Sequence, residues 1–276
     1  MEGTKIKSSI TIAEVANEKS PFILQGRPFL ESLHLAADYG FEAVEIQLSA
    51  PEKLDSETFF GCCNKLGLQL VSIATGLARE EGLSLSAHNE EVRLRSVERI
   101  CKHIDLAVDC GHKPDIMIGY MIGRLAECPN RRVWRSKLGD SMQRISAYAV
   151  QREIGVNLEP VNDYDSDALN TWRDVAEFLD EYNCEHIKIG LDLYHMNIDE
   201  QDILHTISHY SDRIGCIQMM DDNRQVPGRG SFCFEKIVDI VKKTGYDGPI
   251  TMECLPLPDA NTALKEAANF YKRYFG

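Results

Sequence analysis

The stretch IGVNLEPVNDYDSDALNTWRDVAEFLDEYNCEHIKIGLDL, residues 154–193, contains one complete strand–helix–strand unit. Its two ends, 154–160 and 187–193, are short apolar runs rich in β-branched residues, which predict strands. The segment between them, 167–182, has apolar residues at helical spacing and predicts an amphipathic helix. Two strands joined through a helix pair in parallel, by a right-handed crossover. This stretch therefore predicts an α/β fold built on a parallel sheet.

The same alternation recurs along the chain. Further apolar runs predict strands at 5–10, 41–46, 68–74, 114–119, 213–219 and 248–254. Stretches with helical periodicity predict helices between them, at 29–40, 90–111, 202–210, 232–245 and 263–275. Eight units in 276 residues average about 34 residues each, the size of one unit in a closed eight-stranded barrel. The sequence therefore predicts a single (β/α)8 TIM-barrel domain over residues 1–276.

The main alternative fold is a doubly wound open sheet. Its usual mark, a GxGxxG fingerprint after the first strand, is absent from this sequence. No stretch rich in Pro, Gly and Ser divides the chain into two domains, and no low-complexity tract interrupts it. The closed barrel remains the favoured architecture.

Composition excludes several classes of partner. The formal net charge is −13 and the sequence pI is about 5.1, without the basic face that nucleic-acid binding requires. No window approaches the roughly 18 consecutive apolar residues of a membrane span, and the N-terminus lacks the apolar segment of a signal peptide. The nine cysteines show no CxxC spacing. We expect a cytoplasmic, disulfide-free protein that binds neither nucleic acid nor membranes.

Polar residues end four late strands of the predicted barrel. Glu159, Asp192, Gln218 and Glu253 follow one another at intervals of about one strand–helix unit, so their side chains are expected to meet at the C-terminal mouth. Three carboxylates in a low-dielectric mouth repel one another unless protons or a cation neutralise them. Three carboxylates and an amide oxygen suit one divalent cation, Mn²⁺ first, with Mg²⁺ or Co²⁺ as alternatives. The competing interpretation is that each acid caps a strand or pairs with its own basic neighbour.

Other residues near the mouth are candidates for substrate contacts. His195 follows the sixth predicted strand, and we expect it to lie in a loop and bond a substrate hydroxyl, although a structural role is the alternative. Arg224 and Arg229 lie in DDNRQVPGRGSF (221–232), a loop that opens a helix and suits an anionic group; two solvated arginines in an ordinary turn are the alternative. Gly119, past the fourth strand, leaves room for substrate or simply makes a turn.

Several segments together resemble the xylose-isomerase-like sugar phosphate isomerase/epimerase superfamily, and specifically its ketose and keto-acid 3-epimerases. The resemblance runs from about residue 5 to residue 275. Its motifs are NLEPVNDYDSDALNT (157–171), GLDLYHMNIDE (190–200), MDDNRQVPGRGSF (220–232) and ITMECLPLP (250–258). Two further segments, 20–48 and 74–86, resemble bacterial proteins related to 5-keto-gluconate epimerase.

The resemblance implies a metal-dependent sugar isomerase or epimerase. Its metal would be held by Glu159, Asp192, Gln218 and Glu253, with Gln218 standing where the family usually has histidine. The two glutamates would serve as the acid/base pair, removing and returning a proton next to a carbonyl through a cis-enediolate. His195 and Arg224 match positions that contact substrate oxygens. The partners implied are a small-molecule sugar and further copies of the chain in a homo-oligomer.

Alternative functions remain open at this point. Asp163, Asp165 and Ser231 depart from the family pattern, which indicates a rebuilt substrate pocket. A lyase or dehydratase would share proton abstraction, and one such enzyme is the catalytic subunit of C-glycoside deglycosidases, which works with a small partner subunit. A non-catalytic sugar-binding subunit is a further alternative, with Gln218 as the sign of a decayed site. Glu45, which ends the second strand, is expected to support the site without reacting.

Overall fold

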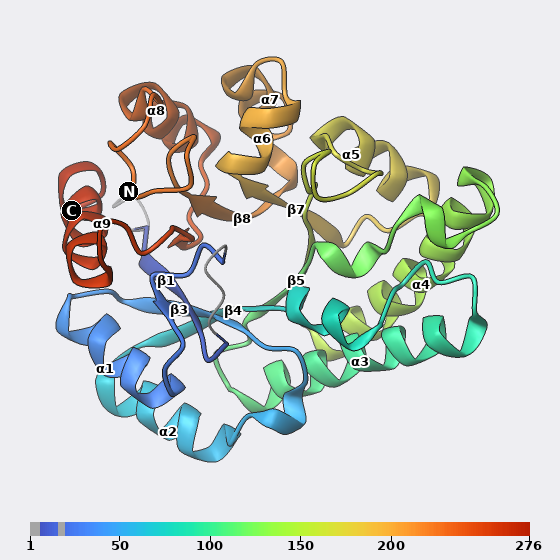
Figure 1. Ribbon diagram of the computed structural model, residues 1–276, viewed down its shortest axis with the longest axis horizontal. Coiled ribbons are helices and arrows are strands. Elements are labelled where there is room, and N and C mark those ends of the chain that lie inside the picture. Colours follow the sequence, from blue (N-terminus) through green and yellow to red (C-terminus); the bar gives the residue numbers. More distant parts are fainter. Residues whose placement is uncertain (1–5, 16–19) are drawn as a thin grey trace.

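The computed structural model describes residues 6–15 and 20–276. Its strands form one parallel sheet in which each barrel strand pairs with the next and β1 also pairs with β9, which closes the barrel (Figure 1). The predicted TIM barrel is therefore confirmed. The barrel strands are β1 (Ser8–Ala13), β3 (Ala43–Gln47), β4 (Gln69–Ala74), β5 (Asp115–Ile118), β6 (Val156–Leu158), β7 (Ile187–Asp192), β8 (Ile214–Met219) and β9 (Ile250–Met252).

The first strand differs from its predicted range of 5–10, of which residue 5 lies outside the described residues. Strand β1 begins at Ser8 and continues to Ala13, because Ile10 and Ile12 pack into the core while Thr11 points to the barrel interior and bonds a buried carboxylate. A short additional strand, β2 (Leu24–Gln25), pairs in parallel with the end of β1.

Helices surround the barrel and cover the outer face of the sheet (Figure 1). Three of them start with a side-chain cap: Asn89, Asn130 and Thr171 each accept a backbone N–H of the following turn. The helices are α1 (Phe29–Asp38), α2 (Ser56–Leu66), α3 (Glu90–Asp109), α4 (Arg131–Arg152), α5 (Trp172–Glu181), α6 (Leu193–Asp199), α7 (Ile203–His209), α8 (Phe234–Thr244) and α9 (Ala260–Tyr274).

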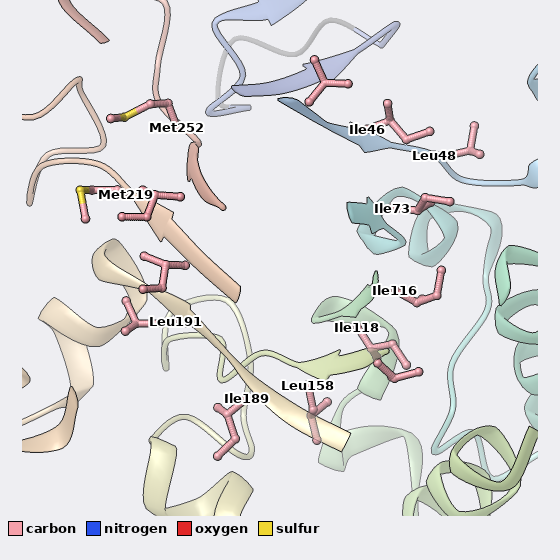
Figure 2. Packing of buried hydrophobic residues seen from close by; sticks show 14 of the residues in the cluster. Ile46, Leu48, Ile73, Ile116, Ile118, Leu158, Ile189, Leu191, Met219 and Met252 are labelled. Carbon is pink, nitrogen blue, oxygen red and sulfur yellow. The ribbon is translucent and has the colours of Figure 1, made fainter. Parts of the chain in front are cut away.

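The main core lies between the barrel wall and the helices. Figure 2 shows its apolar side chains around the wall, among them Ile46, Leu191 and Met219, all of which are fully buried. Burying such a side chain contributes about 1.5–3 kcal/mol. Because side chains alternate along a strand, packing Ile46 and Leu191 in this core turns the neighbouring Glu45 and Asp192 toward the barrel interior. The apolar pattern therefore positions the polar residues of the mouth.

All nine cysteines are free. Among the described residues, none of the helices is long and apolar enough to cross a lipid bilayer.

Candidate functional site

The structure brings the four predicted strand-end residues to the same end of the barrel. Glu159 and Glu253 directly follow β6 and β9, Asp192 ends β7, and Gln218 is the penultimate residue of β8. Asp192 and Gln218 lie opposite each other in the ladder between β7 and β8. All four are buried, with exposed fractions of 8% or less. Convergence at one mouth is what the spacing of the strands predicted.

A cavity of about 310 Å³ opens at this mouth, which is the size range of small-ligand sites. Among the residues that line it are two carboxyl groups, Glu159 and Glu253, and the amide of Gln218. The imidazole of His195 and the guanidinium of Arg224 line it as well. One concave space therefore presents acidic, amide and hydrogen-bond-donating groups together.

Negative charge at this mouth exceeds the positive charge that contacts it. Burial raises the pKa of Glu159 well above its usual range, and the nearby Asp192 and Glu45 raise it further. Burial likewise raises the pKa of Glu253, and Asp192 adds to the effect, whereas Arg224 opposes it. The guanidinium of Arg224 lies 3.7 Å from a carboxylate oxygen of Glu253. Among the described residues, the buried carboxyl groups of Glu159, Asp192 and Glu253 thus share the guanidinium of Arg224, an arrangement that favours a bound cation or protonated acids.

Unpartnered oxygen atoms mark where a cation fits. Asp192 Oδ2 and Gln218 Oε1 are buried and have no hydrogen-bond partner among the described residues. Glu159, Asp192 and His195 each offer a ligand atom, and these atoms lie within 4.8 Å of one another. A donor set dominated by carboxylate and amide oxygens is compatible with a divalent metal ion.

His195 lies in a helix, so the prediction of a loop position is wrong. The residue belongs to the first turn of α6, because Asp192 caps that helix by accepting the backbone N–H of His195 at 2.9 Å. Its Nδ1 accepts the backbone N–H of Asn162 at 3.3 Å and faces the Asn162 side-chain amide at 2.6 Å. Burial lowers the pKa of His195. The ring therefore presents Nε2 to the cavity, where Nη2 of Arg224 lies 3.4 Å away.

Comparison with known proteins identifies the family. A model of the xylose isomerase-like TIM barrel matches residues 33–274. The chain belongs to this family. Ketose 3-epimerase of Arthrobacter globiformis is 26% identical over 222 residues, which cover 80% of this chain and 76% of that protein. This member of the family is an enzyme, as its named relatives are.

Solved structures agree with this fold. The apo structure of 3-keto-D-glucoside 4-epimerase from E. coli superposes with a TM-score of 0.81 at 20% identity, over 98% of this chain and 100% of that one. D-allulose 3-epimerase from Methylomonas sp., in complex with D-allulose, gives a TM-score of 0.81 at 22% identity, over 99% and 98% of the two chains. Both structural similarities support the fold, a xylose isomerase-like barrel.

Gly119, for which the sequence left open room for substrate or a simple turn, makes room for a protein carboxylate in this family member. A Cβ atom at residue 119 would lie 2.4 Å from Glu159 Oε2, far inside contact distance. Gly119 also lines the cavity. The absence of a side chain therefore permits the observed position of the Glu159 carboxylate.

The loop after β8 places its two arginines, Arg224 and Arg229, in different surroundings. Asp221, which is fully buried, accepts the backbone N–H groups of Gly228 and Phe232 and so folds the loop back on itself. Arg224 extends over the ring of Tyr194, 4.3 Å from its centroid, and reaches the cavity. Arg229 instead pairs with Glu266 of α9, at 2.6 Å for its Nη2, and does not line the cavity. The expectation that Arg229 contacts substrate is therefore corrected.

Replacing the two arginines by alanine is expected to give opposite results. Arg229→Ala should leave kcat/KM within about twofold of wild type, because Arg229 pairs with Glu266 on the surface of α9. Arg224→Ala should lower kcat/KM about tenfold or more, through loss of a charged donor in the cavity. Steady-state kinetics of both variants on one substrate would check this. Equal losses in the two variants would contradict the assignment.

Proposed function

We propose that the chain is a divalent-cation-dependent sugar isomerase or epimerase that removes a proton next to a substrate carbonyl. Its relatives are named sugar epimerases, and a structural relative is described in complex with the sugar D-allulose. The observation that carries the proposal is the pair of buried glutamates, Glu159 and Glu253, on one cavity beside unpartnered oxygens of Asp192 and Gln218. A site of this composition combines proton transfer with cation binding.

Four side chains at the mouth are proposed to hold the cation through their oxygen atoms. Glu159, Asp192, Gln218 and Glu253 would be its ligands, and Mn²⁺ is our first choice because the set consists of hard oxygen donors; Mg²⁺ and Co²⁺ are compatible with it. When bound, the cation polarises a sugar carbonyl and acidifies the neighbouring C–H bond.

The glutamates are proposed to move the proton. One of the two carboxylates, Glu159 or Glu253, accepts the α-proton and leaves the substrate as an enediolate, and the other returns a proton. Burial raises the pKa of both groups above the ordinary value of a glutamate, which favours the acceptance of a proton. Return to the opposite face gives epimerisation, and return to the adjacent carbon gives isomerisation.

The neighbouring donors are proposed to bind substrate oxygens. His195 presents Nε2 to the cavity for a substrate hydroxyl, and Arg224 offers a guanidinium whose charge stabilises developing negative charge on the substrate. Asn162 holds the imidazole in place through two contacts to Nδ1. These residues orient the sugar while the glutamates act on it.

Deuterium incorporation from D₂O tests the proposal directly. The Mn²⁺-loaded protein is expected to introduce deuterium next to the carbonyl of at least one sugar in a panel of ketoses, 3-keto-glycosides and 2-keto acids. Removal of metal by a chelator should reduce exchange to the level without enzyme, and added Mn²⁺ should restore it. NMR of the recovered sugars measures both effects.

The products distinguish related reactions. Release of an aglycone or of water alongside exchange would indicate elimination, whereas an intact sugar with changed stereochemistry indicates epimerisation. Absence of exchange across the panel with metal-loaded protein would contradict the proposed function.

A further inference from the structure

The amide of Gln218 lies between two carboxylates inside the barrel. Its Nε2 is 2.9 Å from Glu45 Oε1 and 2.7 Å from Glu253 Oε2. A primary amide nitrogen has two protons, and with a cation at the mouth, which favours the ionised form of both carboxyl groups, each carboxylate only accepts, so both protons are used. The reverse orientation would place the amide oxygen against two carboxylate oxygens. The network therefore fixes which way the amide points.

This orientation leaves one atom of Gln218 available. Its Oε1 is buried without a partner among the described residues, and so is Oδ2 of Asp192, the residue directly opposite it on β7. A buried acceptor without a donor is costly. Two such acceptors on paired strands indicate a group between them that takes electron pairs from both, as a cation does.

The side chain of Glu45 is held in place by a hydrogen bond from strand β1. Thr11 lies opposite Glu45 in the ladder between β1 and β3, and its hydroxyl donates to Glu45 Oε1 at 3.0 Å. The glutamate is 1% exposed and does not line the cavity. Its contact with the mouth therefore runs through Gln218.

We propose that Glu45 is a positioning residue that turns the Gln218 oxygen toward the cation. It accepts one amide proton, which fixes the orientation of the group and increases the electron density on Oε1, as carboxylates do for the ligands they support. This inference rests on the proposed function, since it assumes that a cation binds at the mouth. It gives a role to a buried carboxylate that performs no proton transfer.

Metal affinity is the readout that tests this role. Apoprotein would be titrated with Mn²⁺ by calorimetry, with free Mn²⁺ followed by electron paramagnetic resonance. Glu45→Gln is expected to weaken binding about tenfold, while the melting temperature of the apoprotein changes little. The matched control is Asp115→Asn, at a half-buried carboxylate that accepts the amide of Asn157 at 3.0 Å at the start of β5. Its Mn²⁺ affinity should stay within twofold of wild type.

A second substitution distinguishes loss of the Gln218 amide orientation from a general disturbance of the site. Adding Gln218→His to the Glu45→Gln protein should restore affinity, because an imidazole can donate with one nitrogen and bind the cation with the other. If Glu45→Gln does not fold, Thr11→Val takes its place, since it removes the hydroxyl that holds Glu45, and weaker binding is again expected.

Three results would count against the inference. Wild-type affinity in the Glu45→Gln protein, or a loss that Gln218→His fails to restore, would overturn the positioning role alone. Failure of wild-type protein to bind Mn²⁺ would overturn the proposed cation site and this inference with it. The outcomes are distinguishable because only the last affects the unmodified chain.

Discussion

Glu253→Gln is expected to lower kcat about 10³-fold while the protein keeps its fold. The substitution preserves the shape of the side chain but removes its ability to accept or return a proton, a function that contributes about 10²–10⁴-fold in enzymes. It also removes a negative charge from a buried, acid-rich mouth, so the apoprotein should be no less stable than wild type. Steady-state kinetics, together with the melting temperature of the apoprotein, measure both effects.

Glu235→Gln is the control for this prediction. Glu235 is an exposed glutamate in the first turn of α8 whose partners, Arg273 and Tyr274, lie on α9. Its loss should leave kcat unchanged within about twofold. A Glu253→Gln enzyme with more than a third of wild-type activity would contradict the assignment of Glu253 to proton transfer.

Gly119→Ala is expected to lower kcat/KM about 100-fold, although it adds a single methyl group. The new carbon would lie 2.4 Å from Glu159 Oε2, so the carboxylate must move, and displacement of a reacting group by about 1 Å can cost that much. The effect should fall on activity and Mn²⁺ affinity together, because the same carboxylate is proposed for both. Kinetics and metal titration of the variant check the prediction.

Gly76 provides a matched glycine on the same cavity. A Cβ atom there would meet Tyr120 at 3.4 Å and Gln47 at 4.0 Å, which are ordinary contacts. Gly76→Ala should therefore retain most of the activity. If the two alanine variants were equally active, the steric argument for Gly119 would be wrong.

The fold and the convergence of the site could be predicted because both depend on local periodicity. Short apolar runs identified the barrel strands, and the position of a polar residue at the end of each strand then determined where Glu159 and Asp192 would lie. His195 was misplaced because the apolar run 187–193 continues past the last strand residue. The helix that starts at Leu193 is set by the cap at Asp192.

Contacts between distant segments could not be predicted in the same way. Arg229 is paired with Glu266, 37 residues later, and nothing near Arg229 in the sequence indicates that partner. Glu45 and Gln218 are 173 residues apart, and their contact exists only because the barrel closes. Strand periodicity indicates that both point inward, but it does not specify which groups meet there.

An amide at residue 218 also affects how the mouth responds to acid. A side-chain amide neither gains nor loses a proton in the physiological pH range, whereas an imidazole does. Protons therefore do not compete with a cation for the side chain of residue 218 when the surroundings become mildly acidic. Acid sensitivity of the mouth then depends on its carboxyl groups and on His195, so substituting histidine at residue 218 would add one more proton-binding group to a site that now functions without it.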